Sequence, residues 1–164
     1  LVKPRSNGPG AKVMGLTLEG KVAYLSILQI QAGLTLQRSR YDEPHKWHDD
    51  APAEKKIFRT PDTYGYFTAT YTPIKPLSIA LSGTYTGRML VQRMDITAEN
   101  AELGAMPERK AEAIRTPRFL DLGVKLAYDF KLYKTVDLQL NGGAQNLFES
   151  YLPRSFFAGV KISY

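Results

Sequence analysis

The chain has 164 residues, which suits one ordinary domain, and 43% of them are hydrophobic. Its formal net charge is +6, but the basic residues are spread along the chain rather than gathered in a block, which argues against nucleic-acid binding. The absence of cysteine excludes disulfides and thiolate metal sites. No run approaches the roughly 20 consecutive apolar residues of a membrane helix, so a helical membrane protein is also excluded.

Alternation of apolar and polar residues with a period of two recurs along most of the chain and predicts β-strands, because successive strand side chains point to opposite faces. It is clearest over residues 77–91, where Leu77, Ile79 and Leu81 share one face. The aromatic, Thr-rich segment 64–71 is also expected to be a strand, with its faces unassigned. In chain order, the expected strands are Met14–Tyr24, Leu28–Leu36, Tyr64–Tyr71, Leu77–Val91, Leu120–Phe130, Val136–Asn141 and Phe156–Tyr164.

The lengths and connections of these strands favour a membrane barrel. Most run about 9 to 15 residues, whereas globular strands average about 5–6 and a tilted strand needs about 9 to 11 to cross a bilayer. Short links near residues 25–27, 72–76 and 131–135 alternate with long polar links over 41–63 and 93–118. Outer-membrane barrels have short periplasmic turns and long extracellular loops, so the pattern predicts a protein of the cell outer membrane with a periplasmic C-terminus.

The second long link contains two runs of residues that favour helix, 98–103 and 108–113. Each is expected to be able to form a short helical turn. The expected fold class is all-β.

The end of the chain carries a recognisable pattern. Residues 143–148 read Gly-Ala-Gln-Asn-Leu-Phe, and residues 153–164 begin with Pro-Arg and continue as an alternating strand that ends on Tyr164. This pattern resembles the end of TonB-dependent outer-membrane receptors. Tyr-Thr-Pro at 71–73 and Gly-Thr-Tyr-Thr-Gly at 83–87 are also similar to barrel strands of that family. The link between Phe148 and Pro153 is shorter than is usual there.

The resemblance implies an antiparallel meander of long transmembrane strands that forms the C-terminal segment of a plugged, 22-stranded outer-membrane β-barrel. About seven strands cannot complete such a barrel. We therefore expect residues 1–164 to be its C-terminal portion, with the plug, the TonB-contacting segment and earlier strands upstream. The first ten residues agree, since they contain neither a Met nor the apolar core of a signal peptide.

The resemblance also implies a function and partners. A receptor of this kind takes up a scarce ligand, of the siderophore, cobalamin, glycan or peptide class, with energy coupled through TonB. Its expected partners are outer-membrane lipid, the TonB complex, the barrel assembly machinery and the ligand. Phe156, Val160, Ile162 and Tyr164 would belong to the strand that closes the barrel, and the terminal aromatic would be its assembly signal.

The loop over residues 41–50 holds the best candidates for contact with a ligand, namely His45, Trp47, His48 and Asp49. Two histidines beside adjacent carboxylates could hold a transition metal or a metal chelate. A solvated polar loop is the simpler interpretation, because nothing in the sequence fixes a ligand geometry. We therefore assign no metal and no cofactor.

A polar wall of the barrel could instead line a substrate path or contact a plug, although barrel interiors are polar by default. Its expected residues are Glu19, Lys21, Gln29, Gln31, Arg88, Asp121, Lys125, Asp129, Asp137, Gln139 and Lys161.

No catalytic constellation is recognisable, since the chain lacks cysteine, a Gly-rich phosphate loop before a helix, and a Ser/His/Asp set at familiar spacing. An enzyme is therefore not expected. Two other functions stay open. One is a small structural or adhesion barrel of about eight strands, because a closed bacterial barrel needs an even number. The other is a soluble β-sandwich that acts as a binding module, which would have to bury one face of its long strands against a partner sheet.

Overall fold

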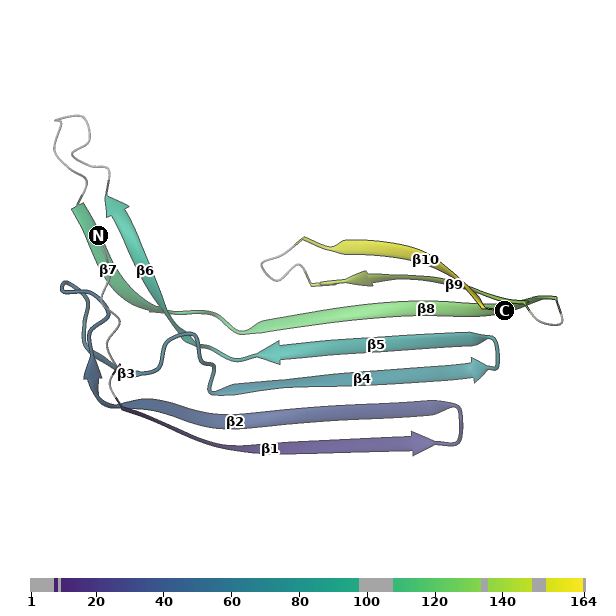
Figure 1. Cartoon of the computed structure of the whole chain (residues 1–164), viewed down its shortest axis with the longest axis horizontal. Coiled ribbons are helices and arrows are strands. Elements are labelled where there is room, and N and C mark those ends of the chain that lie inside the picture. The colour runs from purple at the N-terminus through teal and green to yellow at the C-terminus, as the bar shows by residue number, and fades with distance from the viewer. Residues whose placement is uncertain (1–7, 9, 98–107, 134–135, 149–152, 164) are drawn as a thin grey trace. The chain divides into compact units, whose positions relative to one another are not determined.

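The structure, a computed structural model, describes residues 8, 10–97, 108–133, 136–148 and 153–163. Across these ranges the chain forms strands and no helix, so none of its described segments is a helix able to cross a membrane (Figure 1). The predicted all-β class is confirmed. The strands are β1 (Ala11–Tyr24), β2 (Leu28–His45), β3 (Glu54–Lys56), β4 (Thr63–Ile74), β5 (Leu77–Thr86), β6 (Leu90–Thr97), β7 (Glu108–Arg115), β8 (Phe119–Tyr133), β9 (Val136–Gln145) and β10 (Ser155–Ser163).

The chain divides into two compact units, each built from segments distant in sequence. The first, which we call the loop unit, contains the ranges Leu1–Leu16, Leu36–Asp62 and Gly87–Pro117. The second, which we call the sheet unit, contains Thr17–Thr35, Thr63–Thr86 and Arg118–Tyr164.

Strands of the sheet unit follow one another in chain order. The order is β1-β2-β4-β5-β8-β9-β10, and each pairing with a described register is antiparallel. The turns after β1 and β4 lie at the same end of the sheet, where β8 also ends (Figure 1). The first of these turns closes with the Ile27 amide donating to the Tyr24 carbonyl at 3.2 Å, and Leu25 takes a positive φ of 51°. The predicted antiparallel meander is therefore confirmed.

Each of the seven predicted strands coincides with an observed strand, but three of the predicted ends were wrong by four residues or more. The strand expected to end at residue 141 continues as β9 to Gln145, because β8 and β10 pair with its extension. The strand expected over residues 77–91 stops at Thr86, and β6 begins separately at Leu90. Thr86 lies opposite Tyr64, the second residue of β4, and opposite Phe119, the first residue of β8. Beyond Thr86, β5 therefore has almost no neighbouring strand left to pair with. The strand expected to end at residue 36 continues as β2 to residue 45, because β3 pairs with its extension.

The helical turn expected over residues 108–113 was wrong. This segment belongs to β7 and pairs residue by residue with β6, from Leu90 opposite Arg115 to Thr97 opposite Glu108. Intrinsic helix propensity amounts to a few tenths of a kcal/mol per residue, so pairing with a neighbouring strand overrides it. The other run, 98–103, lies outside the described residues.

The strand register places the apolar residues of neighbouring strands on one face of the sheet unit. Leu81 of β5, for example, lies opposite Ala69 of β4 and Val124 of β8, and directly paired residues share a face. The register also assigns the faces of β4, because Tyr71 lies opposite Ile79. The apolar rows are Phe67 with Gly83 and Leu122; Ala69 with Leu81, Val124, Ala144 and Phe156; Tyr71 with Ile79, Leu126, Gly142 and Ala158; Leu77 with Tyr128, Leu140 and Val160; and Phe130 with Leu138 and Ile162.

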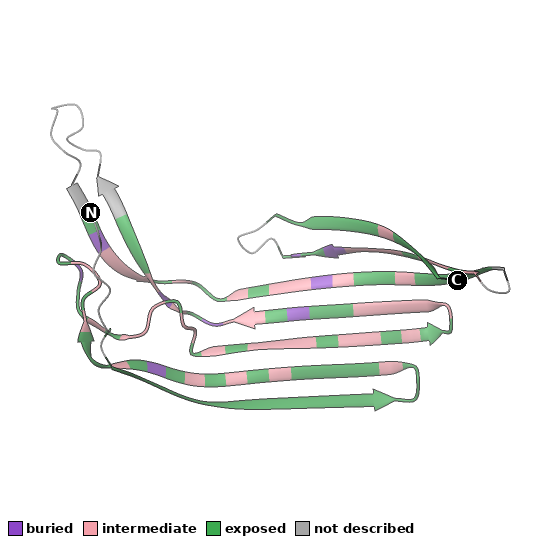
Figure 2. Cartoon of the chain, in the orientation of Figure 1, coloured by how far each residue is buried: buried purple, intermediate pink, exposed green. Residues whose placement is uncertain are grey.

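This apolar face is left without protein cover in the described part of the sheet unit. Ala144, at 7% exposure, is the unit's one buried hydrophobic residue among those described. Phe156 is 77% exposed, and Leu126 and Val160 are also exposed. Figure 2 shows the same scarcity of buried residues, with β1 exposed along its whole length. The unit is thus a single-layered sheet, not the two-layered sandwich that a soluble binding module would need.

The described strands form an open sheet. β1 and β10 stand at the two ends of the strand order and do not pair with each other. Each therefore has one edge without a partner among the described strands. A closed barrel, whether of eight or of 22 strands, is not formed by these strands alone.

The loop unit contains the smaller pairings. β3 pairs with the end of β2, and β6 and β7 form a separate two-stranded sheet. Its buried hydrophobic residues, among those described, are Ala51, Leu90 and Ala111. Backbone hydrogen bonds connect its segments: the Arg59 amide donates to the Leu90 carbonyl at 2.7 Å.

Two adjacent glycines of β9 test the packing of the sheet. A Cβ at Gly143 would fall against the Val124 carbonyl oxygen and 2.6 Å from Cζ of Phe157, whereas at Gly142 the nearest atom is the Phe157 carbonyl oxygen at 3.4 Å. We expect Gly143→Ala to lower the free energy of unfolding by about 1–3 kcal/mol through overpacking. Gly142→Ala is the matched control and should change it by less than about 0.5 kcal/mol. Urea unfolding of the detergent-solubilised chain measures both, and equal effects would contradict the register.

Candidate functional site

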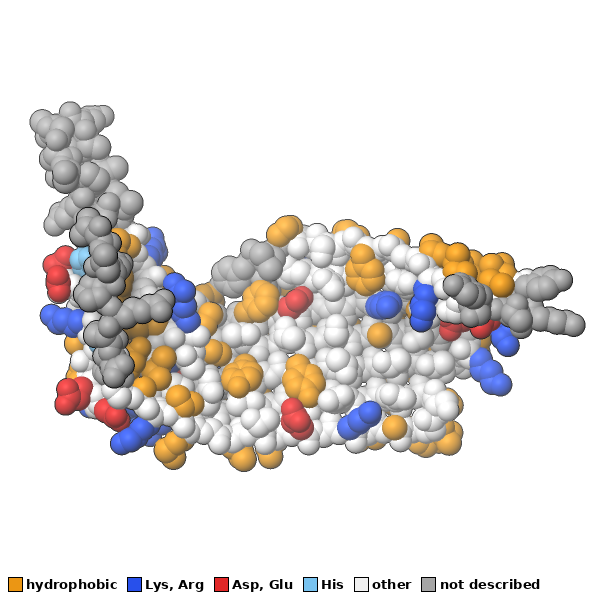
Figure 3. Space-filling model, viewed as in Figure 1, with side chains coloured by type: hydrophobic (Ala, Val, Ile, Leu, Met, Phe, Trp, Pro, Cys, Tyr) orange, Lys and Arg blue, Asp and Glu red, His pale blue; other side chains and the backbone are white. Residues whose placement is uncertain are grey.

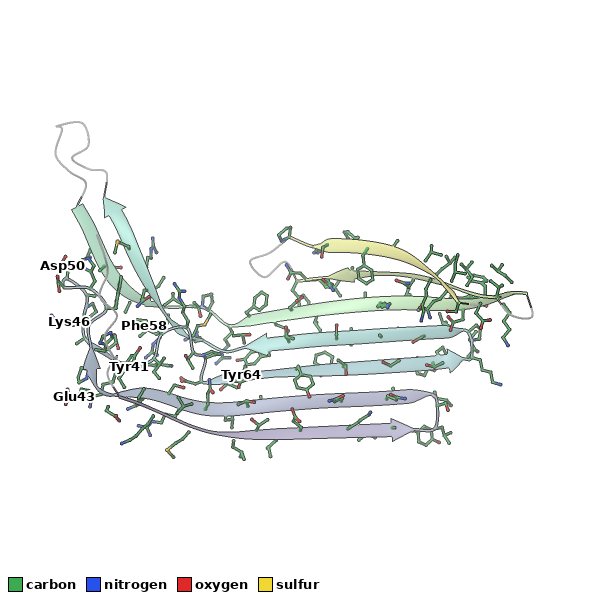
Figure 4. The ribbon with its side chains drawn as sticks, in the orientation of Figure 1. Tyr41, Glu43, Lys46, Asp50, Phe58 and Tyr64 are labelled. Atoms are coloured by element: carbon green, nitrogen blue, oxygen red, sulfur yellow. The ribbon has the colours of Figure 1, made fainter. Side chains whose placement is uncertain are left out.

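The residues expected to contact a ligand lie in the loop unit, at the end of β2 and in the connection that follows it. His45 is the last residue of β2 and lies opposite Glu54 of β3, whereas residues 47–49 belong to the connection. Figure 4 labels two side chains of this region, Tyr41 within β2 and Lys46 just after its end. Strand pairing rather than a free loop therefore fixes the position of His45.

Aromatic contacts hold this region together. The Trp47 ring packs edge-on against the Phe58 ring, with 6.4 Å between the ring centroids. It also lies at a tilt to the His48 ring, with centroids 5.9 Å apart. Tyr41 stacks at a tilt on His45, with centroids 5.3 Å apart. The indole Nε1 of Trp47 is buried. These distances suit aromatic packing, so Trp47 contributes to the internal structure of the loop unit rather than standing free in solvent.

A metal-binding arrangement is not assembled in this region. Nδ1 of His48 accepts a hydrogen bond from the Asp50 amide at 3.3 Å and lies 3.6 Å from the Asp50 carboxylate. His45 makes its contact with Tyr41 instead. Within the described residues, no three His, Asp or Glu side chains converge in a way that could hold a metal ion. Contact of these side chains with a ligand stays a prediction.

The face of the sheet unit opposite the apolar rows carries polar and charged side chains. Figure 3 shows a few acidic and basic side chains scattered over the strands, with some hydrophobic side chains among them. The predicted polar-wall residues that belong to the sheet unit occupy this face, whereas Arg88 belongs to the loop unit, beyond the end of β5. Residues paired directly on this face include Thr84 with Tyr66 and Asp121, Ala80 with Thr70 and Lys125, Asp129 with Gln139, and Gln139 with Lys161.

A tyrosine that sequence analysis did not single out organises one part of this polar face. The Gln31 side chain donates to the Tyr66 hydroxyl at 3.1 Å, and this hydroxyl donates to Glu19 at 3.3 Å. The Tyr66 ring covers Gly33, where a Cβ would lie 2.6 Å from its Cε1. Tyr66 thus joins β1, β2 and β4. Sequence analysis missed Tyr66 because aromatic and Thr residues occur at both odd and even positions of segment 64–71, so its faces could not be assigned.

A groove of about 560 Å³ lies on the polar face beside the short turns. Three lysines and two aspartates line it, and Gln139 donates to Asp129 at 2.7 Å within it. Because charges of both signs alternate here, neighbouring groups can satisfy one another without a ligand. The charged residues are Lys75, Asp129, Lys131, Asp137 and Lys161.

The predicted closing strand is β10. Phe156, Val160 and Ile162 all lie on the exposed apolar face, and β10 pairs with β9 alone among the described strands. Tyr164 lies outside the described residues. Closure with a first barrel strand and recognition of the terminal aromatic stay predictions.

The residues that carry the family resemblance hold the ends of β9 and β10 together. Asn146 is buried with a positive φ of 54°, a conformation that asparagine tolerates better than most residues. The backbone N–H of Asn146 donates to the Asp121 carboxylate at 3.0 Å. Nε of Arg154 donates to the Leu147 carbonyl at 3.1 Å. Asn-Leu-Phe and Pro-Arg therefore have a structural role in the last connection.

No family model matches the chain, and no curated protein sequence matches it. The resemblance to TonB-dependent receptors therefore stays a prediction.

The aromatic contacts of the loop unit can be tested with the single tryptophan of the chain. Phe58→Ala removes the ring that packs on Trp47, so we expect the fluorescence of Trp47 to shift to longer wavelength as water reaches the indole. Phe157→Ala, on β10 in the sheet unit, is the matched control and should leave the emission maximum unchanged. An unshifted spectrum for Phe58→Ala would contradict the packing of Trp47.

Proposed function

We propose that the chain is part of the wall of an outer-membrane β-barrel that works as a receptor and transporter, with uptake coupled to TonB. The observation that carries the membrane assignment is the continuous apolar face of the sheet unit, which the described residues leave without protein cover. The transport assignment is supported by the resemblance at the end of the chain.

Hydrophobic free energy explains why the apolar face implies a bilayer. Removing one Leu, Ile, Val or Phe side chain from water is worth about 1.5–3 kcal/mol. The apolar rows contain more than ten such side chains. The free energy lost by leaving them all in water would exceed the roughly 5–15 kcal/mol of net stability typical of a folded domain. Hydrocarbon covers such a face, while strand pairing satisfies the backbone polar groups inside the membrane.

The dimensions of the strands agree with a membrane span. A tilted strand needs about 9–11 residues to cross the hydrocarbon core. The seven strands of the sheet order contain between 9 residues in β10 and 18 in β2. Tyr128 and Phe130, whose ring centroids are 4.6 Å apart, lie towards the end of β8 that leads to a short turn. Aromatic rings favour this depth, where the membrane meets water.

The polar face would then line the barrel interior and the short turns would face the periplasm. We propose further that the strands belong to a plugged barrel of 22 strands, whose remaining strands and plug belong to a longer protein. The cargo would be a scarce ligand of the siderophore, cobalamin, glycan or peptide class. The partners would be outer-membrane lipid, the TonB complex and the barrel assembly machinery.

Uptake measurements test the transport proposal. Cells that lack the gene for this chain, and cells that lack TonB, would be compared for accumulation of labelled ferric siderophores, cobalamin, oligosaccharides and peptides. Loss of uptake of the same ligand in both strains would support the proposal. Unchanged uptake of all four classes after deletion of the gene would contradict it and favour the alternative, a structural or adhesion barrel.

Two neighbouring residues of β5 test the membrane assignment. Leu81 lies in an apolar row and Ser82 on the polar face. Leu81→Arg should destabilise the inserted protein by about 2–4 kcal/mol, the cost of a basic residue on the lipid face near the bilayer midplane. Ser82→Arg should be milder, because its side chain stays in the polar interior. Folding titrations into lipid vesicles measure both changes, and equal effects would contradict the assignment of the faces.

A further inference from the structure

A cavity of about 480 Å³ in the loop unit has a different character from the groove on the sheet. Three stretches of chain line it: residues 37–40 of β2, residues 54–56 of β3 with Asp62, and Arg115 at the end of β7. Its size falls within the range of about 300–1,000 Å³ that is typical of ligand pockets.

Positive charge dominates the lining of this cavity. Five basic and two acidic side chains take part, and one of each is neutralised in the ion pair between Lys56 and Asp62. Four other basic residues make no ion pair with any residue that the structure describes. Like charges gathered around one cavity repel one another, and a bound anion would relieve that repulsion. The four are Arg38, Arg40, Lys55 and Arg115.

Arg38 and Arg40 lie on one face of β2 and Ser39 on the other, because successive strand side chains alternate. Ser39 is 2% exposed and its Oγ is closed off from solvent, whereas both arginines are exposed. Its carbonyl accepts a hydrogen bond from the Ile57 amide at 3.4 Å. An anion in the cavity would therefore contact the arginines and not the Ser39 hydroxyl.

We propose that this cavity binds a small soluble polyanion that carries at least two phosphate or carboxylate groups. Guanidinium groups bind such oxygens in a bidentate manner, and Arg38 and Arg40 supply two of them from one strand. The inference rests on the loop unit alone and does not depend on the transport function proposed above.

Calorimetric titration of the full chain in detergent tests the proposal, with pyrophosphate and citrate as probes and acetate as the singly charged control. We expect both polyanions to bind at low ionic strength, with an affinity that falls as salt rises to about 0.15 M, and acetate to bind far more weakly. Vesicles of phosphatidylglycerol, compared with phosphatidylcholine, provide the test for a lipid headgroup. Binding to the anionic vesicles without binding to either soluble probe would overturn the proposal.

A double variant separates the cavity from the general positive charge of the protein. Arg38→Gln with Arg40→Gln should weaken pyrophosphate binding by at least about tenfold, because two charged hydrogen-bond donors are lost. Arg88→Gln with Arg118→Gln removes the same charge from exposed arginines outside the lining. This control should stay within about twofold of the unmodified protein. Equal weakening by both pairs would show non-specific attraction and overturn the site.

Ser39→Ala tests whether the anion binds on the arginine face of β2. Removal of this buried hydroxyl should leave the urea midpoint unchanged or raise it. Because the hydroxyl lies on the opposite face from Arg38 and Arg40, the variant should bind pyrophosphate within about twofold of the unmodified chain. Clearly weaker binding by a variant of unchanged stability would place the anion on the other face of the strand and overturn the site.

Discussion

The hydrophobic effect acting on one face of a single-layered sheet is the constraint on which the sheet unit depends. Strand pairing satisfies the backbone, but the described residues supply no second layer to cover rows such as Ala69, Leu81 and Val124. A soluble sheet of this size would need another sheet or helices packed on that face. The proposal of a lipid-facing wall follows from this imbalance, because hydrocarbon is the cover that needs no further protein.

The opposite face follows other rules, which explains its different composition. Tyr66 receives a hydrogen bond from Gln31 and donates one to Glu19, so three strands are joined by polar contacts instead of apolar packing. Glycines such as Gly33 and Gly143 lie beneath the aromatic rings of this face and leave no room for a side chain. Charges of both signs can remain there, provided that water or a neighbouring group satisfies them.

The loop unit contributes chemistry that a sheet wall lacks. Trp47 and Phe58 pack against each other. Arg38 and Arg40 belong to the lining of a cavity in which basic side chains outnumber acidic ones. A polyanion site here and a transport function in the membrane are separate inferences, since one rests on charge and the other on an apolar face. If both hold, the loops would give the protein a preference for negatively charged ligands.

Alternation within the sequence determined the all-β class, the approximate positions of seven strands and their apolar faces, because a strand repeats every two residues whatever its partner is. Register decided what this local pattern leaves open: the faces of β4, the end of β5 at Thr86, and the pairing of β7 with β6 against its helix propensity. Likewise, sequence drew attention to His45 and Trp47 because their side chains are rare in this chain. Only the tertiary structure showed that these two side chains pack on aromatic neighbours. It also showed that Ser39 and Arg115 line one cavity, although they are 76 positions apart in the printed sequence. Such meetings depend on how distant strands pair, which no local pattern encodes.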